Sequence, residues 1–179
     1  MKRHRTGFRK KARHIVLLLL DVDGVLTDGR IIVDDRGVET KNFHVRDGQG
    51  IALLMRGGID VGFLTARASR SVSRRAKELG VTLVRQSVDD KLAAYEEIKA
   101  SRNLQDKQIA YMGDDIIDLP ILRKAGLALT VADAWPGLRA AVDVIARAAG
   151  GAGAVREIAE LVLKAQSKWD RLIEELTQA

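Results

Sequence analysis

Two acidic residues directly follow the longest apolar run in the first part of this 179-residue chain. Asp21 and Asp23 come after residues 15–20, IVLLLL, a run that is typical of a strand buried on both faces. Because side chains alternate along a strand, acids at i and i+2 point the same way. Their carboxylates repel each other unless a cation, hydrogen bonds or a chemical role compensates. Taken alone, the pair could also belong to an ordinary turn.

Other polar residues also follow short apolar runs, and they are candidates for the same site. Thr65, Lys91 and the pair Asp114–Asp115 each lie after such a run. Because ligands bind outside the carboxyl ends of strands in open parallel sheets, we expect these residues to meet at one edge. Each residue alone could be a helix cap or a surface residue. Their joint occurrence in this order favours a catalytic site.

The chemistry that these residue types could perform is phosphoryl transfer through a covalent aspartyl-phosphate. Asp21 would be the nucleophile, and Asp23 would protonate the leaving alcohol and then activate water. Asp114 would hold a hard cation such as Mg²⁺, which carboxylate oxygens favour. Thr65 would bind a phosphate oxygen, and Lys91 would add positive charge to the transition state. Two more acids are predicted to support the metal site: Asp115 and Asp118.

The elements that must position these residues form a βα-repeating pattern, which predicts a doubly wound, mainly parallel, Rossmann-like α/β sheet. A turn at 34–37 between two short apolar runs predicts a β-hairpin that projects from the sheet edge. The insert between Asp23 and Thr65 is too short for a large cap domain. A helix is expected over 51–56, capped by Asp47 or Gly48, and a single last helix over 154–177.

Composition narrows the class of protein. The net charge is +6, but seven basic residues and no acid lie in residues 1–13, so 14–179 carry −1. We therefore predict a basic, disordered tail over 1–13 and a phosphatase domain over 14–179, with nucleic acid an unlikely partner. No apolar run reaches the ~18 residues of a membrane span. The absence of cysteine excludes disulfides and thiolate metal sites and fits a reducing, cytoplasmic location.

Several motifs together resemble the haloacid-dehalogenase-like phosphatases. Their four motifs have counterparts in DVDGVLTDG (21–29), TAR (65–67), Lys91 and GDDIIDLP (113–120). FHVRDGQGI and GAGAVRE are similar to segments of the small-capped branch that hydrolyses phosphorylated sugar acids, typified by 3-deoxy-D-manno-octulosonate 8-phosphate phosphatase. The resemblance covers roughly residues 14–160.

The resemblance implies roles for individual residues. Asp21 is implied as nucleophile, Asp23 as acid and base, and Asp114 as a Mg²⁺ ligand, with Asp21 and the Asp23 carbonyl as the other protein ligands. It also implies a homotetramer, in which the hairpin and a neighbouring subunit close the site, and a role in lipopolysaccharide precursor synthesis. The positions that match contacts to the phosphorylated sugar acid are His44, Val45, Arg46, Asp47, Gly48, Arg67, Arg75 and Lys91.

Three departures from the branch leave the substrate open. Ala66 and Ser87 stand where glycine is usual, and Ala52 occupies a position that is usually basic. A basic residue facing the pocket would suit a substrate carboxylate. One alternative is therefore the same chemistry on a sialic-acid-type 9-phosphate or another small phosphorylated metabolite. The others are a phosphoacceptor signalling domain and an inactive interaction module.

Overall fold

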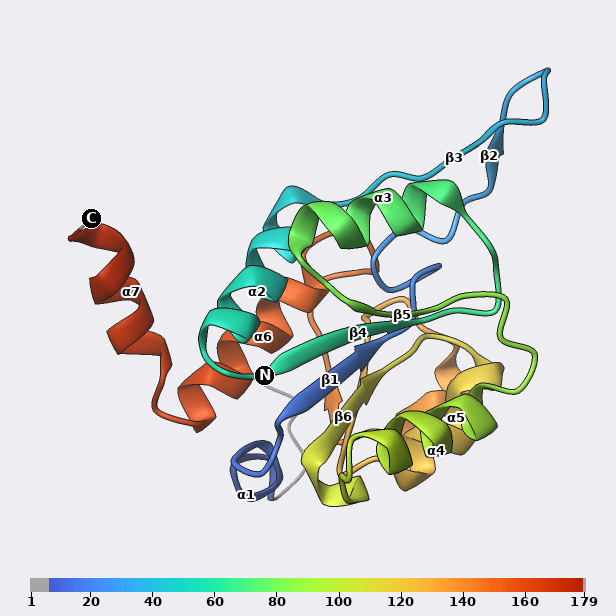
Figure 1. Ribbon diagram of the computed structural model, residues 1–179. Helices are drawn as coiled ribbons and strands as arrows, with labels where there is room; N and C mark the ends of the chain where they lie inside the picture. The colour runs from blue at the N-terminus through green and yellow to red at the C-terminus, as the bar shows by residue number, and fades with distance from the viewer. Residues whose placement is uncertain (1–6, 179) are drawn as a thin grey trace.

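A six-stranded parallel sheet forms the centre of the computed structural model, which describes residues 7–178 (Figure 1). The strand order is β5-β4-β1-β6-β7-β8, so β1 lies inside the sheet and the chain winds outward in both directions. This confirms the predicted fold class. The strands are β1 (Leu17–Leu20), β4 (Asp60–Leu64), β5 (Leu83–Arg85), β6 (Ile109–Met112), β7 (Leu127–Thr130) and β8 (Val144–Ile145).

Helices cover both faces of the sheet. The leucines of β1 show why: Leu18 and Leu20 face one hydrophobic core, and Leu17 and Leu19 face the other. Such a strand needs an apolar side chain at every position, which explains the unbroken run. One face packs on α1 (Phe8–Ala12), α2 (Val45–Arg56), α3 (Arg70–Leu79) and α6 (Ala154–Ala165), and the other on α4 (Lys91–Ser101) and α5 (Leu119–Lys124). Short 3₁₀ turns are η1 (Asp106–Gln108), η2 (Ile116–Asp118) and η3 (Pro136–Ala140).

The predicted hairpin is present and extends away from the body (Figure 1). It consists of β2 (Ile32–Val33) and β3 (Glu39–Thr40), paired antiparallel. Asp34 closes the turn by accepting hydrogen bonds from the backbone N–H groups of Arg36 and Val38. Four apolar side chains of the hairpin are exposed to solvent within ten residues of one another. They are Ile31, Ile32, Val33 and Val38.

Two helix predictions were wrong in their bounds. Helix α2 begins at Val45 rather than at residue 51, and its cap is His44, whose Nδ1 accepts from Arg46 N at 3.2 Å. The last helix is two helices, α6 and α7 (Trp169–Thr177). Ser167 adopts a left-handed φ of 57° between them, a conformation that interrupts a helix.

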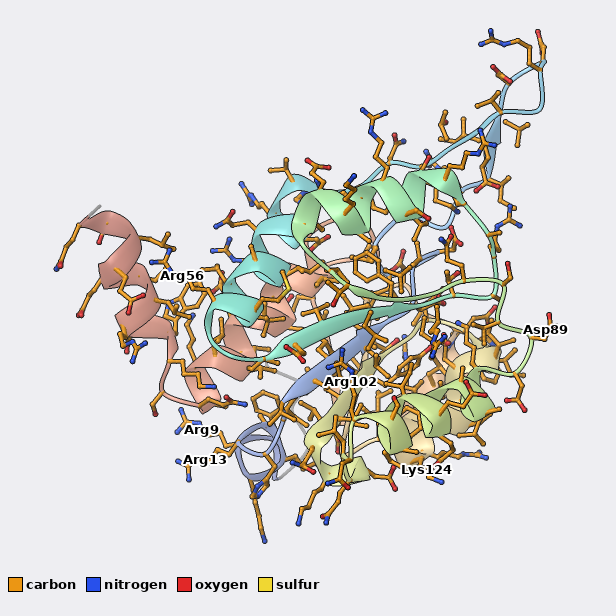
Figure 2. The ribbon with its side chains drawn as sticks, viewed as in Figure 1. Arg9, Arg13, Arg56, Asp89, Arg102 and Lys124 are labelled. Atoms are coloured by element: carbon orange, nitrogen blue, oxygen red, sulfur yellow. The ribbon has the colours of Figure 1, made fainter. Side chains whose placement is uncertain are left out.

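The basic tail is ordered in the part that the structure describes. Helix α1 buries Phe8 and Ala12 against the main core, so the prediction of disorder was wrong there; residues 1–6 lie outside the described residues. Arg9 of this helix and Arg13, which directly follows it, point outward (Figure 2). Disorder was predicted from the basic charge of the tail alone, although Phe8 and Ala12 have the i, i+4 spacing of one helix face.

No helix among residues 7–178 combines the length and the apolar character that crossing a membrane requires.

Candidate active site

Asp21 lies just beyond the carboxyl end of β1 and is 5% exposed. Its Oδ2 is 2.9 Å from Lys91 Nζ, and its Oδ1 accepts a hydrogen bond from Val22 N at 2.7 Å. Burial raises the pKa of Asp21 to about 7, although the charge of Lys91 opposes that rise. The nearby Asp118 carboxylate raises this pKa further. The carboxylate therefore needs more positive charge than Lys91 alone provides.

Lys91 is the first residue of α4, where the Asp90 side chain caps the helix by accepting from Ala93 N. The Lys91 ammonium bridges two acids, because its Nζ is also 2.7 Å from Asp118 Oδ1. Burial alone would lower the pKa of Lys91, but the Asp21 and Asp118 carboxylates raise it above its ordinary value. Lys91 is thus a permanent cation that is 5% exposed at the floor of the site.

Asp118 anchors this group of residues rather than offering a free ligand atom. Its Oδ1 accepts from Tyr111 Oη at 2.6 Å as well as from Lys91. Its Oδ2 accepts from the backbone N–H groups of Asp114 and Asp115 at 2.9 and 3.2 Å. Both carboxylate oxygens are therefore occupied. Asp118 is fully buried and contacts both Lys91 and the backbone of the loop after β6.

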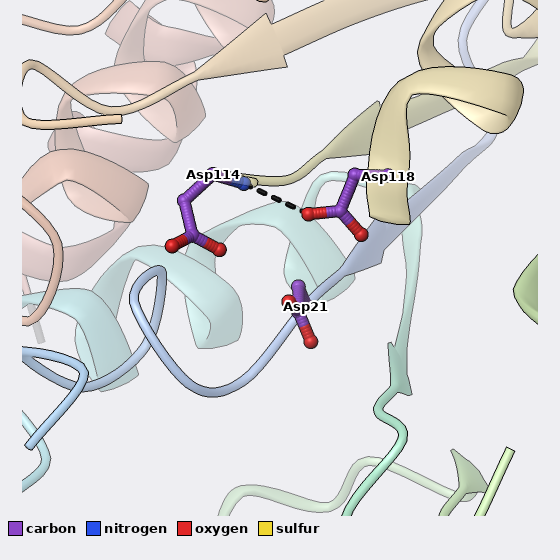
Figure 3. Close-up of side chains that lie close together, drawn as sticks. All are labelled: Asp21, Asp114 and Asp118. Atoms are coloured by element: carbon purple, nitrogen blue, oxygen red, sulfur yellow. Dashed lines mark hydrogen bonds between the residues drawn. The ribbon is translucent and has the colours of Figure 1, made fainter. Parts of the chain in front are cut away.

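Carboxylate oxygens of Asp21, Asp114 and Asp118 lie within 4.8 Å of one another, and these residues form the one group of this kind among residues 7–178 (Figure 3). Burial raises the pKa of Asp114 to about 7, and the charge of Asp21 adds to the rise. Gly24 has a φ of 87°, and a Cβ there would lie 2.1 Å from Asp114 Oδ2. A crowded set of oxygen donors, short of positive charge, fits Mg²⁺.

A cavity of about 250 Å³ opens above these residues. Thr65, at the end of β4, lines it and is buried, with its Oγ1 accepting from Arg67 N at 3.3 Å. The structure brings seven residues of the predicted site to this one cavity, as expected for strand ends on one edge of a parallel sheet. They are Asp21, Asp23, Thr65, Arg67, Lys91, Asp114 and Asp115.

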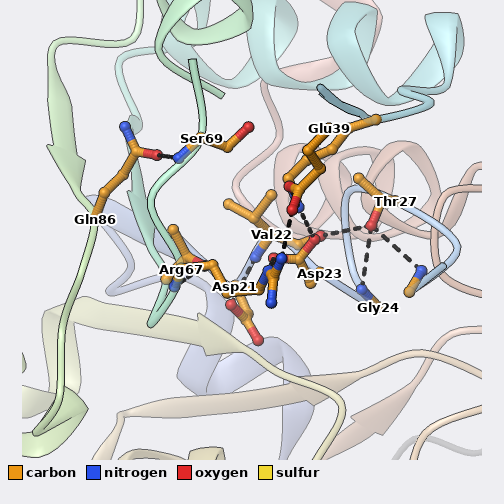
Figure 4. A network of polar contacts seen from close by, with 12 residues as sticks. Asp21, Val22, Asp23, Gly24, Thr27, Glu39, Arg67, Ser69 and Gln86 are labelled. Atoms are coloured by element: carbon orange, nitrogen blue, oxygen red, sulfur yellow. Dashed lines mark hydrogen bonds and ion pairs between the residues drawn. The ribbon is translucent and has the colours of Figure 1, made fainter. Parts of the chain in front are cut away.

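Asp23 contacts residues that the sequence analysis did not identify. Its Oδ1 accepts a hydrogen bond from Lys41, which follows β3, and Lys41 Nζ is 3.0 Å from Glu39 Oε1. Glu39 also accepts from Arg67, so four charged side chains form one network (Figure 4). Hydrogen bonds from Lys41 and Arg67 lower the pKa of Glu39. The i, i+2 spacing of Glu39 and Lys41 was the available signal, since it places both on one side of a strand.

The positions that match sugar-acid contacts lie mostly outside this cavity. His44, Asp47, Gly48 and Arg75 line a separate crevice of about 10 Å³ between α2 and α3. Asp47 is buried and accepts from Gly153 N at 3.1 Å and Arg156 N at 2.8 Å, so its carboxylate caps α6. The sequence analysis expected Asp47 or Gly48 to cap the helix that follows them, but the Asp47 carboxylate caps α6 instead.

The neighbours Val45 and Arg46 are exposed on the first turn of α2 and line neither cavity, and Val45 is 79% exposed. Ala52, on the same helix, also lines neither cavity. The expectation that position 52 faces the pocket therefore does not hold within one chain.

The glycine-rich loop before α6 braces the loop that carries Gly24. A Cβ at Gly150 would lie 1.8 Å from Gly24 O, and Gly151 N donates to Val25 O at 3.0 Å. Only glycine permits this approach of two backbones. Gly150 and the first residue of the segment GAGAVRE therefore pack against the loop that carries Gly24.

Comparison with known proteins shows close relatives along nearly the whole chain. No protein-family model matches. The chain is 45% identical over 159 residues to a 3-deoxy-D-manno-octulosonate 8-phosphate phosphatase from Yersinia pestis, which covers 89% of this chain and 85% of that protein. It is 44% identical over 160 residues to the Escherichia coli K12 phosphatase of the same name, with the same coverage.

Solved structures agree with this similarity. The crystal structure of 3-deoxy-D-manno-octulosonate 8-phosphate phosphatase from Moraxella catarrhalis, in complex with magnesium, phosphate and KDO, superposes with a TM-score of 0.94. The two chains are 43% identical, with 97% of this chain and 99% of that chain covered. A subfamily IIIA haloacid-dehalogenase hydrolase from Legionella pneumophila has a TM-score of 0.92 and 40% identity, with 96% and 94% covered.

Proposed function

The chain belongs to the 3-deoxy-D-manno-octulosonate 8-phosphate phosphatase family of haloacid-dehalogenase-like hydrolases, and we propose that it hydrolyses that sugar-acid phosphate to the free sugar acid and phosphate. The observation that carries the proposal is the pairing of Asp21 with the buried cation of Lys91 at the floor of an open cavity. Phosphoryl transfer needs such a nucleophile beside fixed positive charge.

In the first step Asp21 attacks the phosphorus atom, and the bond from phosphorus to the leaving sugar oxygen breaks. Lys91 and the Thr65 hydroxyl would balance the charge on the phosphoryl oxygens. Asp23 donates its proton to the departing oxygen, so the sugar leaves as a neutral alcohol. These roles are supported by the position of all four side chains on the wall of the same cavity.

In the second step Asp23, now a carboxylate, takes a proton from a water molecule. That water attacks the aspartyl-phosphate, and Asp21 and inorganic phosphate are released. We infer that Mg²⁺ would be held by Asp21, Asp114 and the Asp23 carbonyl, where it offsets the negative charge that the phosphate adds. The pKa values of Asp21 and Asp114 are raised by burial and by neighbouring carboxylates, and a bound cation would offset both effects, which supports this choice of ligands.

We also propose a homotetramer that acts in the cytoplasm. The exposed apolar hairpin supports association, and an arm that projects from one subunit could close the open cavity of another. The crevice lined by His44 and Arg75, together with Val45, Arg46 and position 52, would then contact substrate across a subunit boundary. Light scattering on a hairpin deletion that joins Gly29 to Phe43 would test the assembly.

Phosphate release in the presence of Mg²⁺ tests the function. The panel would contain 3-deoxy-D-manno-octulosonate 8-phosphate, a sialic-acid-type 9-phosphate and common sugar phosphates, with Asp21→Asn beside the wild type. We expect the eight-carbon substrate to be preferred and the variant to be inactive. A preference for another phosphate would keep the mechanism and reject the substrate. Release that survives in Asp21→Asn would reject the mechanism.

A further inference from the structure

One lysine at the base of the projecting hairpin, Lys41, contacts the catalytic residue Asp23. Lys41 follows β3, and its side chain is 2% exposed although the hairpin around it is largely open to solvent. Its ammonium donates a hydrogen bond to Asp23 Oδ1, and Lys41 is not among the residues that line the cavity. A buried lysine at the base of an exposed arm is held there by specific partners, since burying an ammonium is costly.

Asp23 depends on this lysine for its orientation. Within the part of the chain that the structure describes, Asp23 Oδ2 has no hydrogen-bond partner, and Arg67 Nε lies 4.0 Å away, beyond hydrogen-bond distance. One carboxylate oxygen is therefore fixed by Lys41, while the other is buried without a hydrogen-bond partner among the described residues. That arrangement suits a group that must hold or receive a proton at one defined oxygen.

Glu39 holds the lysine in turn. It lies two residues before Lys41, contacts its ammonium at 3.0 Å and also accepts from Arg67. The network joins two basic and two acidic side chains, and Figure 4 labels Asp23, Glu39 and Arg67. Removing Glu39 would leave Asp23 as the one acidic partner of both Lys41 and Arg67 among the described residues.

We propose that Lys41, held by Glu39, is a positioning residue that orients Asp23 for proton transfer to the leaving oxygen. The inference rests on the proposed phosphatase function and adds to it that the hairpin stem helps to build the acid step. Because Lys41 does not line the cavity, it would act on the leaving group only through Asp23. Its effect should therefore depend on how much the leaving group needs a proton.

Leaving-group dependence gives a test that a merely structural role would not pass. A sugar phosphate has an alkoxide leaving group and needs protonation, whereas p-nitrophenyl phosphate releases a stable anion and does not. Rapid-quench measurement of the first turnover isolates this step from the later hydrolysis. The variants are Lys41→Met, Glu39→Gln and Lys41→Arg, with Lys124→Met as the control on an exposed ion pair of α5.

We expect Lys41→Met to slow the first turnover of the sugar phosphate by about 10- to 100-fold and that of p-nitrophenyl phosphate by less than about threefold. Glu39→Gln should give the same selectivity with a smaller loss. Lys41→Arg, which keeps the cation, should restore most of the sugar-phosphate rate, and Lys124→Met should match the wild type. Asp23→Asn is the reference for complete loss of the acid.

Equal losses on both substrates, or no loss on either, would overturn the positioning role while leaving the phosphatase function intact. If Lys41→Met does not fold, the selectivity of Glu39→Gln decides in the same way. A wild type that is inactive on every phosphate would instead reject the proposed function, and the inference with it. Circular dichroism of each variant distinguishes misfolding from a lost step.

Discussion

Removing the metal should make the stability of this protein unusually sensitive to pH, because its central carboxylates are buried. Burial raises the pKa of Asp21 from 3.8 to about 7. Between those pH values the folded protein keeps a proton that the unfolded chain has released. Since the folded state then binds more protons, the free energy of unfolding falls as pH rises. Below pH 3.8 both states are protonated and the penalty disappears.

The size of the effect follows from the gap between the two pKa values. At about 1.4 kcal/mol per pKa unit, a gap from 3.8 to about 7 corresponds to roughly 4 kcal/mol at neutral pH. About 3 kcal/mol of this falls between pH 4.5 and 7. Asp21 is only 5% exposed, so solvent screens little of it. Asp114 adds a contribution of the same sign, but part of its raised pKa comes from Asp21.

Urea unfolding from pH 4.5 to 7.5 would measure the loss, with EDTA or with saturating Mg²⁺. We expect the free energy of unfolding to fall steeply with pH in EDTA and much less in Mg²⁺, because the cation stabilises the ionised carboxylates. Asp21→Asn in EDTA should lose about 3 kcal/mol less than the wild type over pH 4.5–7. Lys91 stays charged over this pH range. Loss of its ion pair with Asp21 should therefore change the free energy of unfolding of the variant by the same amount at every pH, without changing its slope against pH. Parallel curves for the two proteins in EDTA would refute the reasoning.

Three substitutions test other parts of the site and fold. Gly24→Ala places a methyl group against Asp114 at a φ of 87°, so the carboxylate must move, and calorimetry should show Mg²⁺ affinity lowered by about 10- to 100-fold. Lys91→Met removes the cation that bridges the floor of the site, and kcat should fall by about 10²- to 10³-fold, whereas a change confined to KM would contradict its role. Phe8→Ala should lower the free energy of unfolding by about 3 kcal/mol, the low end for a buried aromatic, and no change would show that α1 does not stabilise the core.

The parallel sheet and its catalytic edge could be predicted because each signal is local. The run before Asp21 requires a strand buried on both faces, and a parallel sheet places strand ends together, so Thr65, Lys91 and Asp114 follow from topology alone. The start of α2 and the break before α7 could not be predicted in this way. The His44 side chain caps the first turn of α2 by accepting from Arg46 N. Ser167 separates α6 from α7 through a left-handed backbone angle that serine does not favour.

The contacts of Asp23 show the limit of the same reasoning more sharply. Predicting Lys41 as its partner required knowing that the chain after β3 returns to Asp23, which follows β1. No periodicity within the hairpin encodes that path, because it depends on how the arm packs against distant residues such as Arg67. The sequence does contain the charge pattern, a Glu-x-Lys spacing at Glu39 and Lys41. That spacing alone does not predict that the lysine is buried, because a lysine on an exposed strand is normally solvated. The Lys41 side chain is only 2% exposed because Asp23 binds its ammonium, so the burial of this lysine reflects the active site as well as the hairpin.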